Sequence, residues 1–235
     1  SRALRPKQLL ALAGEGALLR QTVERVLPLC AEGGSAGWER VLIATGAHLA
    51  AATGAMLPEL GEQAFLLEPL PRNTAPCIAW AAAVVARRDP EAVLMVLPSD
   101  HHIADEEGFR RTLAAAVESA RSGAITTIGI RPTRAETGFG YIEVEGEVVT
   151  GQAQRGLSFV EKPSAEVAAA YVAGGRHLWN AGMFFFRAKD MLAAVAAYLP
   201  EVSAGLVTLD QAAARGEERE ALLAVFPAMP SISID

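Results

Sequence analysis

Short apolar runs alternate with longer stretches of helical spacing, and this alternation restricts the fold more than any other feature of the sequence. Apolar runs lie at residues 40–45, 92–97 and 124–130, and helical patterning lies at 16–29 and 106–121. A short apolar run bounded by turn residues is typical of a buried strand. Strands that alternate with helices favour a mostly parallel sheet covered on both faces. We therefore expect an α/β fold.

Weaker patterns fill the intervals and continue through the second half of the chain. Further strands are expected at 64–67, 139–144, 157–160 and 182–187, and further helices at 47–57, 74–88, 165–172, 190–198 and 217–225. No internal repeat, low-complexity segment or linker separates these elements. We therefore expect one continuous domain over residues 1–235.

Composition excludes several functional classes. The formal net charge is −6 and no block rich in Lys or Arg occurs, which argues against a nucleic-acid partner. The longest apolar run, residues 77–86, is too short to cross a bilayer, so we expect no membrane span. Cys30 and Cys77 are the only cysteines, which is typical of reduced thiols in a cytoplasmic protein.

The strand that ends at residue 97 predicts a ligand site in the loop that follows it. In parallel α/β sheets, ligands lie beyond the carboxyl ends of the strands. Asp100 in this loop is a candidate for Mg²⁺, which prefers oxygen ligands, although a loop aspartate can equally bond its own backbone. His101 and His102 do not form a zinc site by this reasoning, because no Cys/His set with metal spacing accompanies them.

Two further segments carry polar groups beside predicted strand or helix ends. Glu161 and Lys162 follow a strand stopped by Pro163, and they could accept a sugar hydroxyl and hold a phosphate, or form an ordinary ion pair. Residues 68–76 open a helix, where backbone N–H groups could bind a base or phosphate or be capped by Asn73.

Two glycines and one asparagine complete the set of candidates. Gly138 and Gly140 would allow a ligand to approach the backbone closely, and a turn with a bulge explains them equally well. Asn180 could bind sugar hydroxyls or make a turn. Lys7, Lys162 and Lys189 are the only lysines in an arginine-rich chain, which a need for their compact ammonium groups or chance alone explains.

Taken in order, these segments resemble bacterial mannose-1-phosphate guanylyltransferases, within the nucleotide-diphospho-sugar transferases. The resemblance rests on Arg-Pro-Lys-Gln at 5–8, Glu-Pro at 68–69, Arg-Asn-Thr-Ala-Pro at 72–76, Leu-Pro-Ser-Asp-His at 97–101, Glu-Thr-Gly-Phe-Gly-Tyr-Ile at 136–142, Phe-Val-Glu-Lys-Pro at 159–163, Trp-Asn-Ala-Gly-Met-Phe at 179–184 and Ser-Ile-Ser-Ile-Asp at 231–235. It spans nearly the whole chain, and the ordered set is specific although each piece alone is not.

The resemblance implies a Rossmann-like, three-layer α/β/α nucleotidyltransferase domain with a mixed, mostly parallel sheet. Its substrates would be GTP and mannose 1-phosphate, and its cofactor Mg²⁺, with Mn²⁺ as the alternative. The implied nucleotide contacts are Arg2, Lys7, Glu68, Arg72, Asn73 and Thr74, and the implied metal ligands are Asp100 and Asp235. Gly140, Glu161 and Asn180 would hold mannose, Lys162 would hold its phosphate, and Lys7, Asp100 and Lys162 would be the catalytic groups.

The chain departs from the family pattern at its start and end. The family begins with a strand and a Gly-rich phosphate loop, whereas this sequence starts at Ser1-Arg2, and the family continues beyond Asp235. We therefore expect little turnover from residues 1–235 alone. The sequence leaves the oligomeric state open, with a homodimer as one candidate.

Two alternatives stay open. One is the same fold with another base or sugar, such as a glucose-1-phosphate thymidylyl- or uridylyltransferase. The other is a non-catalytic homologue that binds a nucleotide sugar. The presence of Asp100, Asp235, Lys7 and Lys162 favours the enzyme, because function follows the site and not the fold.

Overall fold

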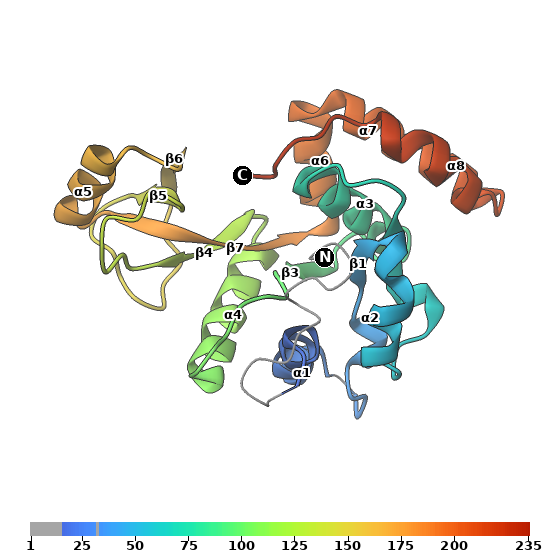
Figure 1. Cartoon of the computed structure of the whole chain (residues 1–235), viewed down its shortest axis with the longest axis horizontal. Helices are drawn as coiled ribbons and strands as arrows, with labels where there is room; N and C mark the ends of the chain where they lie inside the picture. The colour runs from blue at the N-terminus through green and yellow to red at the C-terminus, as the bar shows by residue number, and fades with distance from the viewer. Residues whose placement is uncertain (1–15, 32) are drawn as a thin grey trace. The chain divides into compact units, whose positions relative to one another are not determined.

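The computed structural model describes residues 16–31 and 33–235, which form two compact units (Figure 1). Unit 1 comprises the described residues up to Ala92 together with Pro98–Arg110 and Ala188–Ile234. Unit 2 comprises Val93–Leu97, Arg111–Arg187 and Asp235. The expectation of a single catalytic domain over residues 1–235 stays a prediction, and each unit is described by itself below.

The described residues form helices and strands in nearly the predicted order. The helices are α1 (Leu18–Cys30), α2 (Ala50–Met56), α3 (Thr74–Ala86), α4 (Glu106–Arg121), α5 (Ala165–Gly174), α6 (Ala188–Tyr198), α7 (Pro200–Ala214) and α8 (Glu218–Val225). The strands are β1 (Ile43–Gly46), β2 (Phe65–Glu68), β3 (Val93–Val96), β4 (Thr126–Ile130), β5 (Gly140–Val144), β6 (Gly156–Glu161) and β7 (His177–Arg187). Short 3₁₀ turns lie at Trp38–Arg40, Ala47–Leu49, Glu62–Ala64 and Phe226–Ala228.

In unit 1, strands β1 and β2 form a parallel two-stranded sheet, with Ile43 opposite Phe65 and Gly46 opposite Glu68. The apolar stripe of α1 packs on this sheet, and its Leu19 and Val23 join Ile43 in one buried cluster. This is the packing that an amphipathic helix next to a parallel strand predicts. It also brings Glu68, the last residue of β2, to the carboxyl edge of the sheet.

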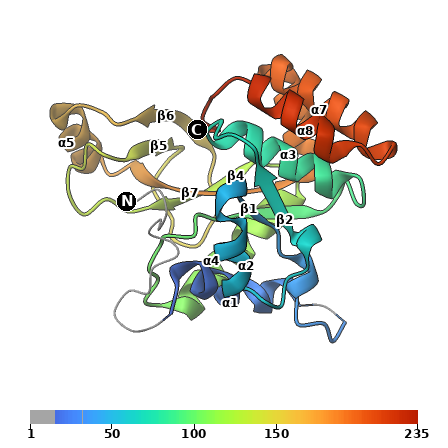
Figure 2. The same ribbon diagram turned by 45° about the vertical axis from the view of Figure 1, so that its right-hand side comes forward.

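Helix α3 is the buried helix of unit 1, with α6 and α7 packed against it (Figure 2). Its residues are apolar on every side, as expected for a helix enclosed by other elements. Trp80 meets Phe226 edge to face, with ring centroids 5.7 Å apart. At its end, the Arg87 guanidinium bonds both oxygens of Glu218 and Asp210 Oδ1 at 2.8–2.9 Å, so α3 is tied to α7 and α8.

Helix α7 is not among the helices predicted from the sequence. Its Pro200 occupies the first turn, where the missing N–H costs nothing. Its buried residues Val202, Leu206 and Leu209 recur at helical spacing, so a signal was present. Gly205 and Thr208 weaken the intrinsic helix propensity of the segment, and packing against α6 and α8 stabilises it instead.

In unit 2, the long strand β7 organises a five-stranded sheet of order β3-β7-β5-β6, with β4 also paired to β7. Phe184 of β7 is opposite Val96 on one edge and Thr127 on the other, so β3 and β4 flank β7. Every pair in this sheet is antiparallel. Phe185 and Phe186 are fully buried, as the run of three phenylalanines predicts.

The prediction of a mostly parallel sheet does not hold for the described strands, of which only β1 and β2 pair in parallel. The strand–helix–strand pattern does make β3 and β4 run in the same direction. They are not neighbours, however, because β7 returns between them in the opposite direction. Mixed α/β is therefore the observed class, and the three-layer arrangement stays a prediction.

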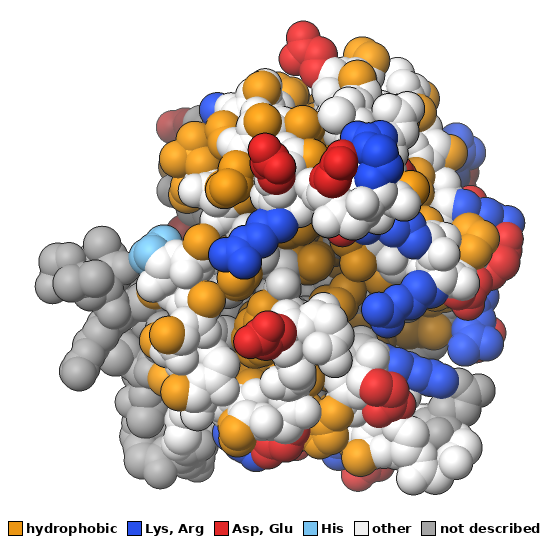
Figure 3. Space-filling view, turned by 90° about the vertical axis from the view of Figure 1, so that its right-hand side faces the viewer, with side chains coloured by type: hydrophobic (Ala, Val, Ile, Leu, Met, Phe, Trp, Pro, Cys, Tyr) orange, Lys and Arg blue, Asp and Glu red, His pale blue; other side chains and the backbone are white. Residues whose placement is uncertain are grey.

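The described surface agrees with the composition. On the face drawn in Figure 3, Lys and Arg side chains are interspersed with Asp and Glu, and the described residues form no continuous basic surface there. Within residues 16–31 and 33–235, no helix is both long and apolar enough to span a bilayer.

Candidate active site

The predicted site residues fall into three groups. Arg2 and Lys7 lie outside the described residues. Asp100 and the loop with Glu68, Arg72, Asn73 and Thr74 belong to unit 1. Gly140, Glu161, Lys162, Asn180 and Asp235 belong to unit 2.

In unit 1, Asp100 lies in a turn after β3 and is exposed. It makes no hydrogen bond or ion pair with another described residue. The alternative of a loop aspartate that bonds its own backbone therefore finds no support in the described contacts. An exposed carboxylate of this kind is chemically suited to a hard cation such as Mg²⁺.

The loop before α3 holds Asn73 in a strained backbone conformation, with φ 64° and ψ −163°. Residues other than glycine rarely adopt this region, and it costs about 1–3 kcal/mol. The Asn73 Oδ1 accepts a 2.9 Å hydrogen bond from the backbone N–H of Thr74, which caps α3. Capping alone does not require positive φ, because cap residues normally have extended backbone.

Thr74 is fixed by the segment at residues 231–234. Its hydroxyl oxygen accepts a 2.9 Å bond from the Ile234 N–H and lies 3.2 Å from the Ser233 hydroxyl. The next residue, Ala75, donates its N–H to the Ile232 carbonyl at 3.1 Å. These contacts hold the loop before α3 in one conformation.

Arg72 and Glu68 are both engaged inside unit 1. The Arg72 guanidinium donates to the Pro227 carbonyl, and its buried Nε has no partner among the described residues. Burial raises the pKa of Glu68, and a hydrogen bond from the Cys77 thiol acts in the opposite direction. Burial and the neighbouring Glu68 carboxylate raise the pKa of Cys77 to about 12. Cys77 is therefore an unreactive thiol at neutral pH.

In unit 2, Gly140 and Glu161 are opposite each other in the β5–β6 pair. A Cβ at Gly140 would lie 2.7 Å from Glu161 Oε2 and 2.7 Å from the Phe159 ring. The glycine therefore leaves the space that the Glu161 carboxylate and the Phe159 ring occupy. This close approach, and not backbone strain, explains why glycine stands here.

Lys162 follows Glu161 in a left-handed conformation with φ 46°. Its N–H donates to the Phe139 carbonyl at 3.2 Å, and its Nζ lies 2.8 Å from Glu161 Oε1. The hydrogen bond and charge of Glu161, followed by the charge of Asp235, raise the pKa of Lys162. Asn73 and Lys162 are the only described non-glycine residues with positive φ, and both are predicted site residues.

Asn180 joins this group through an irregularity in β7. Between Thr127 and Gly129 of β4, the register with β7 shifts from Phe184 to Asn180, so four residues of β7 span two of β4. Gly182, with φ 65°, absorbs the bend. Such bulges redirect a side chain out of the regular alternation. Here the Asn180 Nδ2 donates to Asp235 Oδ1 at 2.6 Å.

Of the predicted site residues of unit 2, Asn180 and Asp235 border a cavity of about 350 Å³, whereas Gly140, Glu161 and Lys162 are not among its lining residues. Asn180 and Asp235 line it beside Thr127 and Ser158, and the apolar wall comes from Ile142, Leu157, Phe159 and Phe184. A polar rim above an apolar wall suits a sugar ring, which has polar edges and apolar C–H faces.

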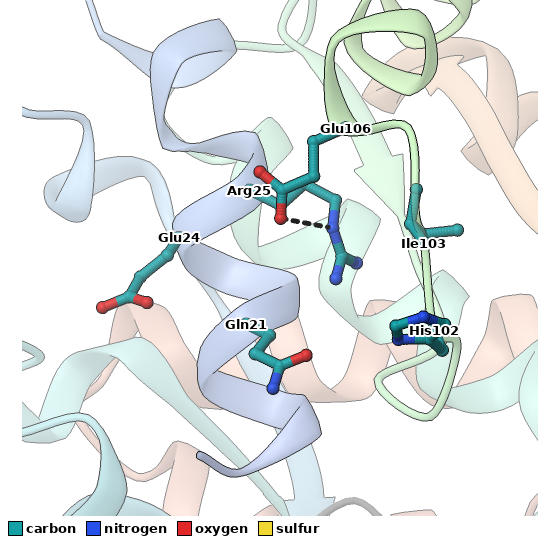
Figure 4. Close-up of a pocket in the computed structure, with 6 residues that line it drawn as sticks. All are labelled: Gln21, Glu24, Arg25, His102, Ile103 and Glu106. Carbon is teal, nitrogen blue, oxygen red and sulfur yellow. Dashed lines mark hydrogen bonds and ion pairs between the residues drawn. The ribbon is translucent and has the colours of Figure 1, made fainter. Parts of the chain in front are cut away.

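A second cavity, of about 280 Å³ in unit 1, contains none of the predicted site residues (Figure 4). Gln21, Glu24 and Arg25 of α1 line it together with His102, Ile103 and Glu106. The Arg25 side chain is only 3% exposed, and its Nε lies 3.4 Å from Glu106 Oε1. This ion pair between a buried guanidinium and a half-exposed carboxylate links α1 to the start of α4, which indicates a structural role.

Comparison with known protein families identifies the family of this chain. The profile described as nucleotidyl transferase matches residues 1–219. The chain belongs to the nucleotidyl transferase family.

Named relatives of this nucleotidyl transferase include a xanthan biosynthesis protein and a mannose-1-phosphate guanylyltransferase. The chain is 38% identical over 242 residues to the xanthan biosynthesis protein XanB of Xanthomonas campestris pv. campestris (strain B100), covering 100% of this chain and 49% of XanB. It is 41% identical over 210 residues to a mannose-1-phosphate guanylyltransferase of Escherichia coli (strain K12), covering 86% and 42%. The chain thus spans about half the length of these curated relatives.

Two solved structures are similar to this nucleotidyl transferase. One, from Thermus thermophilus and described as a mannose-1-phosphate geranyltransferase, has a TM-score of 0.84 and 35% identity over 100% of this chain and 64% of that protein. The other, from Helicobacter pylori and described as a mannose-6-phosphate isomerase, has a TM-score of 0.79 and 26% identity over 99% and 88%.

The donor chemistry of the nucleotidyl transferase fits a magnesium ion better than zinc. Asp100 in unit 1 and Asp235 in unit 2 are each exposed carboxylates, and Mg²⁺ can be held by a single carboxylate because substrate phosphates and water complete its octahedron. Within the described residues, no three His, Cys, Asp or Glu side chains stand close enough to form a metal site by themselves.

Two residues that orient Asn180 in the candidate site were not predicted from the sequence. Thr127 donates its hydroxyl to Asn180 Oδ1 at 2.9 Å, and Gly182 donates its N–H to the same oxygen at 3.1 Å. Gly182 gave only an ambiguous signal, since a glycine at the start of a predicted strand indicates either a turn or a bulge. Thr127 gave none, because threonine is common in ordinary strands.

Proposed function

We propose that this chain forms the catalytic domain of a mannose-1-phosphate guanylyltransferase, which transfers GMP from GTP to α-D-mannose 1-phosphate. The observation that carries the proposal is the group of Lys162, Glu161, Asn180 and Asp235 within unit 2. There the Lys162 ammonium pairs with the Glu161 carboxylate, the Asn180 amide donates to Asp235, and the charge of Asp235 acts on Lys162. The relatives' names support the choice of GTP and mannose 1-phosphate.

The sugar phosphate is assigned to unit 2. The Lys162 ammonium attracts the phosphate as a point charge, and the phosphate then competes with Glu161 for it. Glu161, once released, accepts sugar hydroxyls. Asn180 retains one amide hydrogen beyond its bond to Asp235, so it donates to a hydroxyl. The Gly140 backbone lets the ring approach closely.

The nucleotide is assigned to the loop before α3 and to the start of the chain. Asn73 and Thr74 present polar atoms at the amino end of a helix, where an anion or a base edge is favoured. Glu68 and Arg72 complete the guanine side, and Arg2 and Lys7 are assigned to the phosphates. The strained Asn73 supports a role in binding, since strain persists where function requires it.

The reaction is an in-line displacement. A phosphate oxygen of mannose 1-phosphate forms a bond to the α-phosphorus of GTP, and the bond from that phosphorus to the bridging oxygen of pyrophosphate breaks. The attacking oxygen is already ionised, so no strong general base is needed. The protein's part is to position two polyanions and to offset their repulsion. Mg²⁺, for which Asp100 and Asp235 are the proposed ligands, would supply further positive charge at the phosphates.

The finer description of the fold belongs to the same proposal. We assign a single nucleotidyltransferase domain with a three-layer α/β/α arrangement to residues 1–235. The family match supports it, because the match extends from residue 1 to residue 219 and so includes sequence of both units. The 0.84 TM-score over the full chain supports it as well.

A matrix of substrates tests the proposal. The complete protein is incubated with Mg²⁺ and each of GTP, UTP, dTTP and ATP, against mannose 1-phosphate and glucose 1-phosphate, and products are separated by chromatography. We expect GDP-mannose as the dominant product. A preference for dTTP or UTP with glucose 1-phosphate would assign the site to another member of the family. Mannose 6-phosphate is tested as a third sugar phosphate, because one structural relative is described as a mannose-6-phosphate isomerase.

A further inference from the structure

We infer that Thr127 is a positioning residue whose hydroxyl fixes the orientation of the Asn180 amide and, through it, of the Asp235 carboxylate. The geometry stands by itself, and its meaning for catalysis rests on the proposed function, in which Asp235 is a metal ligand. Thr127 touches neither substrate nor metal directly in this account. It acts through a relay of two hydrogen bonds.

The orientation of the Asn180 amide is determined by its donors. The Gly182 backbone N–H can only donate, so the amide atom 3.1 Å from it must be the oxygen. The nitrogen therefore points the other way, toward Asp235 Oδ1 at 2.6 Å, where a carboxylate can only accept. A flipped amide would place an acceptor against a carboxylate and a donor against an N–H.

The Thr127 hydroxyl adds a second anchor from a different strand. Gly182 lies on the same strand as Asn180, and one hydrogen bond alone leaves the amide free to pivot about it. The 2.9 Å bond from Thr127 of β4 uses the other lone pair of the oxygen. With both lone pairs occupied, the amide plane is locked and one of its two N–H groups points at Asp235.

The surroundings strengthen this relay. Thr127, Asn180 and Asp235 line the same cavity, whose other wall is apolar. The hydrogen bond from Thr127 to Asn180 is partly buried and is therefore stronger than it would be in water, whereas the bond from Asn180 to Asp235 is exposed; linked hydrogen bonds also polarise one another. Oriented partners of metal-binding carboxylates tune metal affinity, typically by about 10–100-fold when they are lost.

Three variants separate the hydroxyl from the shape of the side chain. Thr127→Val keeps the volume and removes the hydroxyl, and Thr127→Ser keeps the hydroxyl. Thr126→Val is the matched control, because the Thr126 hydroxyl lies 2.9 Å from the Ser119 hydroxyl and has no part in the relay. All three are compared by thermal melting first, so that loss of folding is recognised.

The first readout follows the Asn180 amide itself. Residues 1–235 contain two asparagines, Asn73 and Asn180, so ¹⁵N-asparagine labelling of this chain gives two side-chain amide signals. Asn73→Asp assigns them. We expect the Asn180 signal of Thr127→Val to shift and exchange faster with solvent, and that of Thr127→Ser and Thr126→Val to stay as in the wild type. An unchanged signal in Thr127→Val overturns the inference.

The second readout follows the metal. Binding of Mn²⁺ to the complete protein with GDP-mannose present is measured by electron paramagnetic resonance. We expect Thr127→Val to raise the Mn²⁺ dissociation constant about fivefold to tenfold, as expected for one lost hydrogen bond, and Thr127→Ser to restore it. The Mg²⁺ concentration for half-maximal turnover should rise in parallel, with the KM for GTP unchanged.

The two readouts distinguish the possible failures. If the amide signal moves and the Mn²⁺ affinity of Thr127→Val equals that of Thr127→Ser, the relay does not reach the metal ligand and the inference is overturned. If the wild type itself binds no Mn²⁺ with nucleotide sugar, the proposed function fails. The amide signal then still decides whether Thr127 orients Asn180.

Discussion

The Asn180 Nδ2 donates a 2.6 Å hydrogen bond to Asp235 Oδ1, and these two residues are 55 positions apart in the chain. Asn180 is delivered by the bulge in β7, and Asp235 ends the described chain. The bond brings a proposed sugar contact against a proposed metal ligand. Both assignments therefore depend on the same pair of side chains.

Replacing this amide by a carboxylate should disrupt the site without removing its shape. In Asn180→Asp, two carboxylates would face each other, and like charges in contact raise the pKa of one of them. We expect kcat/KM for mannose 1-phosphate to fall by about 100-fold, within the range for lost partners of metal ligands. Protonation would partly restore the donor, so the loss should be smaller at acidic pH. A pH–rate profile parallel to that of the wild type would contradict the pairing.

A methyl group at Gly140 should displace the Glu161 carboxylate. The Cβ of Gly140→Ala would lie 2.7 Å from Glu161 Oε2, closer than such contacts allow. We expect the KM for mannose 1-phosphate to rise about tenfold, equivalent to roughly 1.4 kcal/mol. Gly138→Ala is the control, because its Cβ meets only Glu136 Oε1 at 3.4 Å. An equal KM for mannose 1-phosphate in the two variants would show that a methyl group at residue 140 does not displace the Glu161 carboxylate.

The left-handed backbone at Lys162 predicts that glycine and alanine variants differ in stability and lose binding equally. Lys162→Gly and Lys162→Ala both remove the ammonium, and only glycine adopts φ 46° without steric cost. We expect the glycine variant to melt about 2–4 °C above the alanine variant. Calorimetry should show that both lose affinity for mannose 1-phosphate to the same extent. A glycine variant that binds as the wild type does would remove Lys162 from the site.

His177 should make unit 2 less stable at acidic pH. Burial lowers the pKa of His177, the Glu143 carboxylate raises it, and Arg176 lowers it. The unfolded chain then binds a proton at higher pH than the folded chain, so stability is full above the ordinary pKa of about 6.5 and falls as the pH drops below it. His177→Phe keeps a ring stacked on Tyr171, whose ring centroid lies 3.8 Å from that of His177. Urea denaturation between pH 5 and 8 should show a flatter pH dependence for this variant, and an equally steep one would contradict the assignment.

Much of the fold follows from local pattern. Helix α4 is predicted at 106–121 and observed at Glu106–Arg121, since acidic residues open it and Gly123 follows it. The direction of strands β3 and β4 is also predictable from the helix between them. The pairing partner of strands β3 and β4 cannot be predicted from local pattern, because it is β7, which lies more than 45 residues further along the chain.

The length and bend of β7 cannot be read from the sequence. The local pattern predicts only residues 182–187, whereas the strand begins at His177. Trp179 and Asn180 precede Gly182, and a glycine at this place in the sequence indicates a turn. In the structure this glycine has a positive φ. In the structure, pairing with both β4 and β5 extends the strand through this glycine. The bulge that aims Asn180 is therefore a tertiary property.

The candidate residues are easier to predict than their contacts. Resemblance points to Asn180 and Asp235 separately, and the structure joins them by a hydrogen bond. It also engages Arg72 with the Pro227 carbonyl, a contact between residues 155 positions apart that no local pattern reveals. Residue types at strand ends can be read from a sequence, whereas hydrogen-bond partners depend on which distant backbone returns beside them.

Transfer of labelled GMP to mannose 1-phosphate distinguishes the proposed guanylyl transfer from simple hydrolysis of GTP. The complete protein is incubated with mannose 1-phosphate, Mg²⁺ and GTP labelled with ³²P at either the α or the γ position, with Asp100→Asn as the matched variant. The account predicts α label in GDP-mannose, γ label in pyrophosphate, and loss of both products in Asp100→Asn with an unchanged melting temperature. Release of labelled inorganic phosphate without GDP-mannose, or full activity in Asp100→Asn, would contradict it.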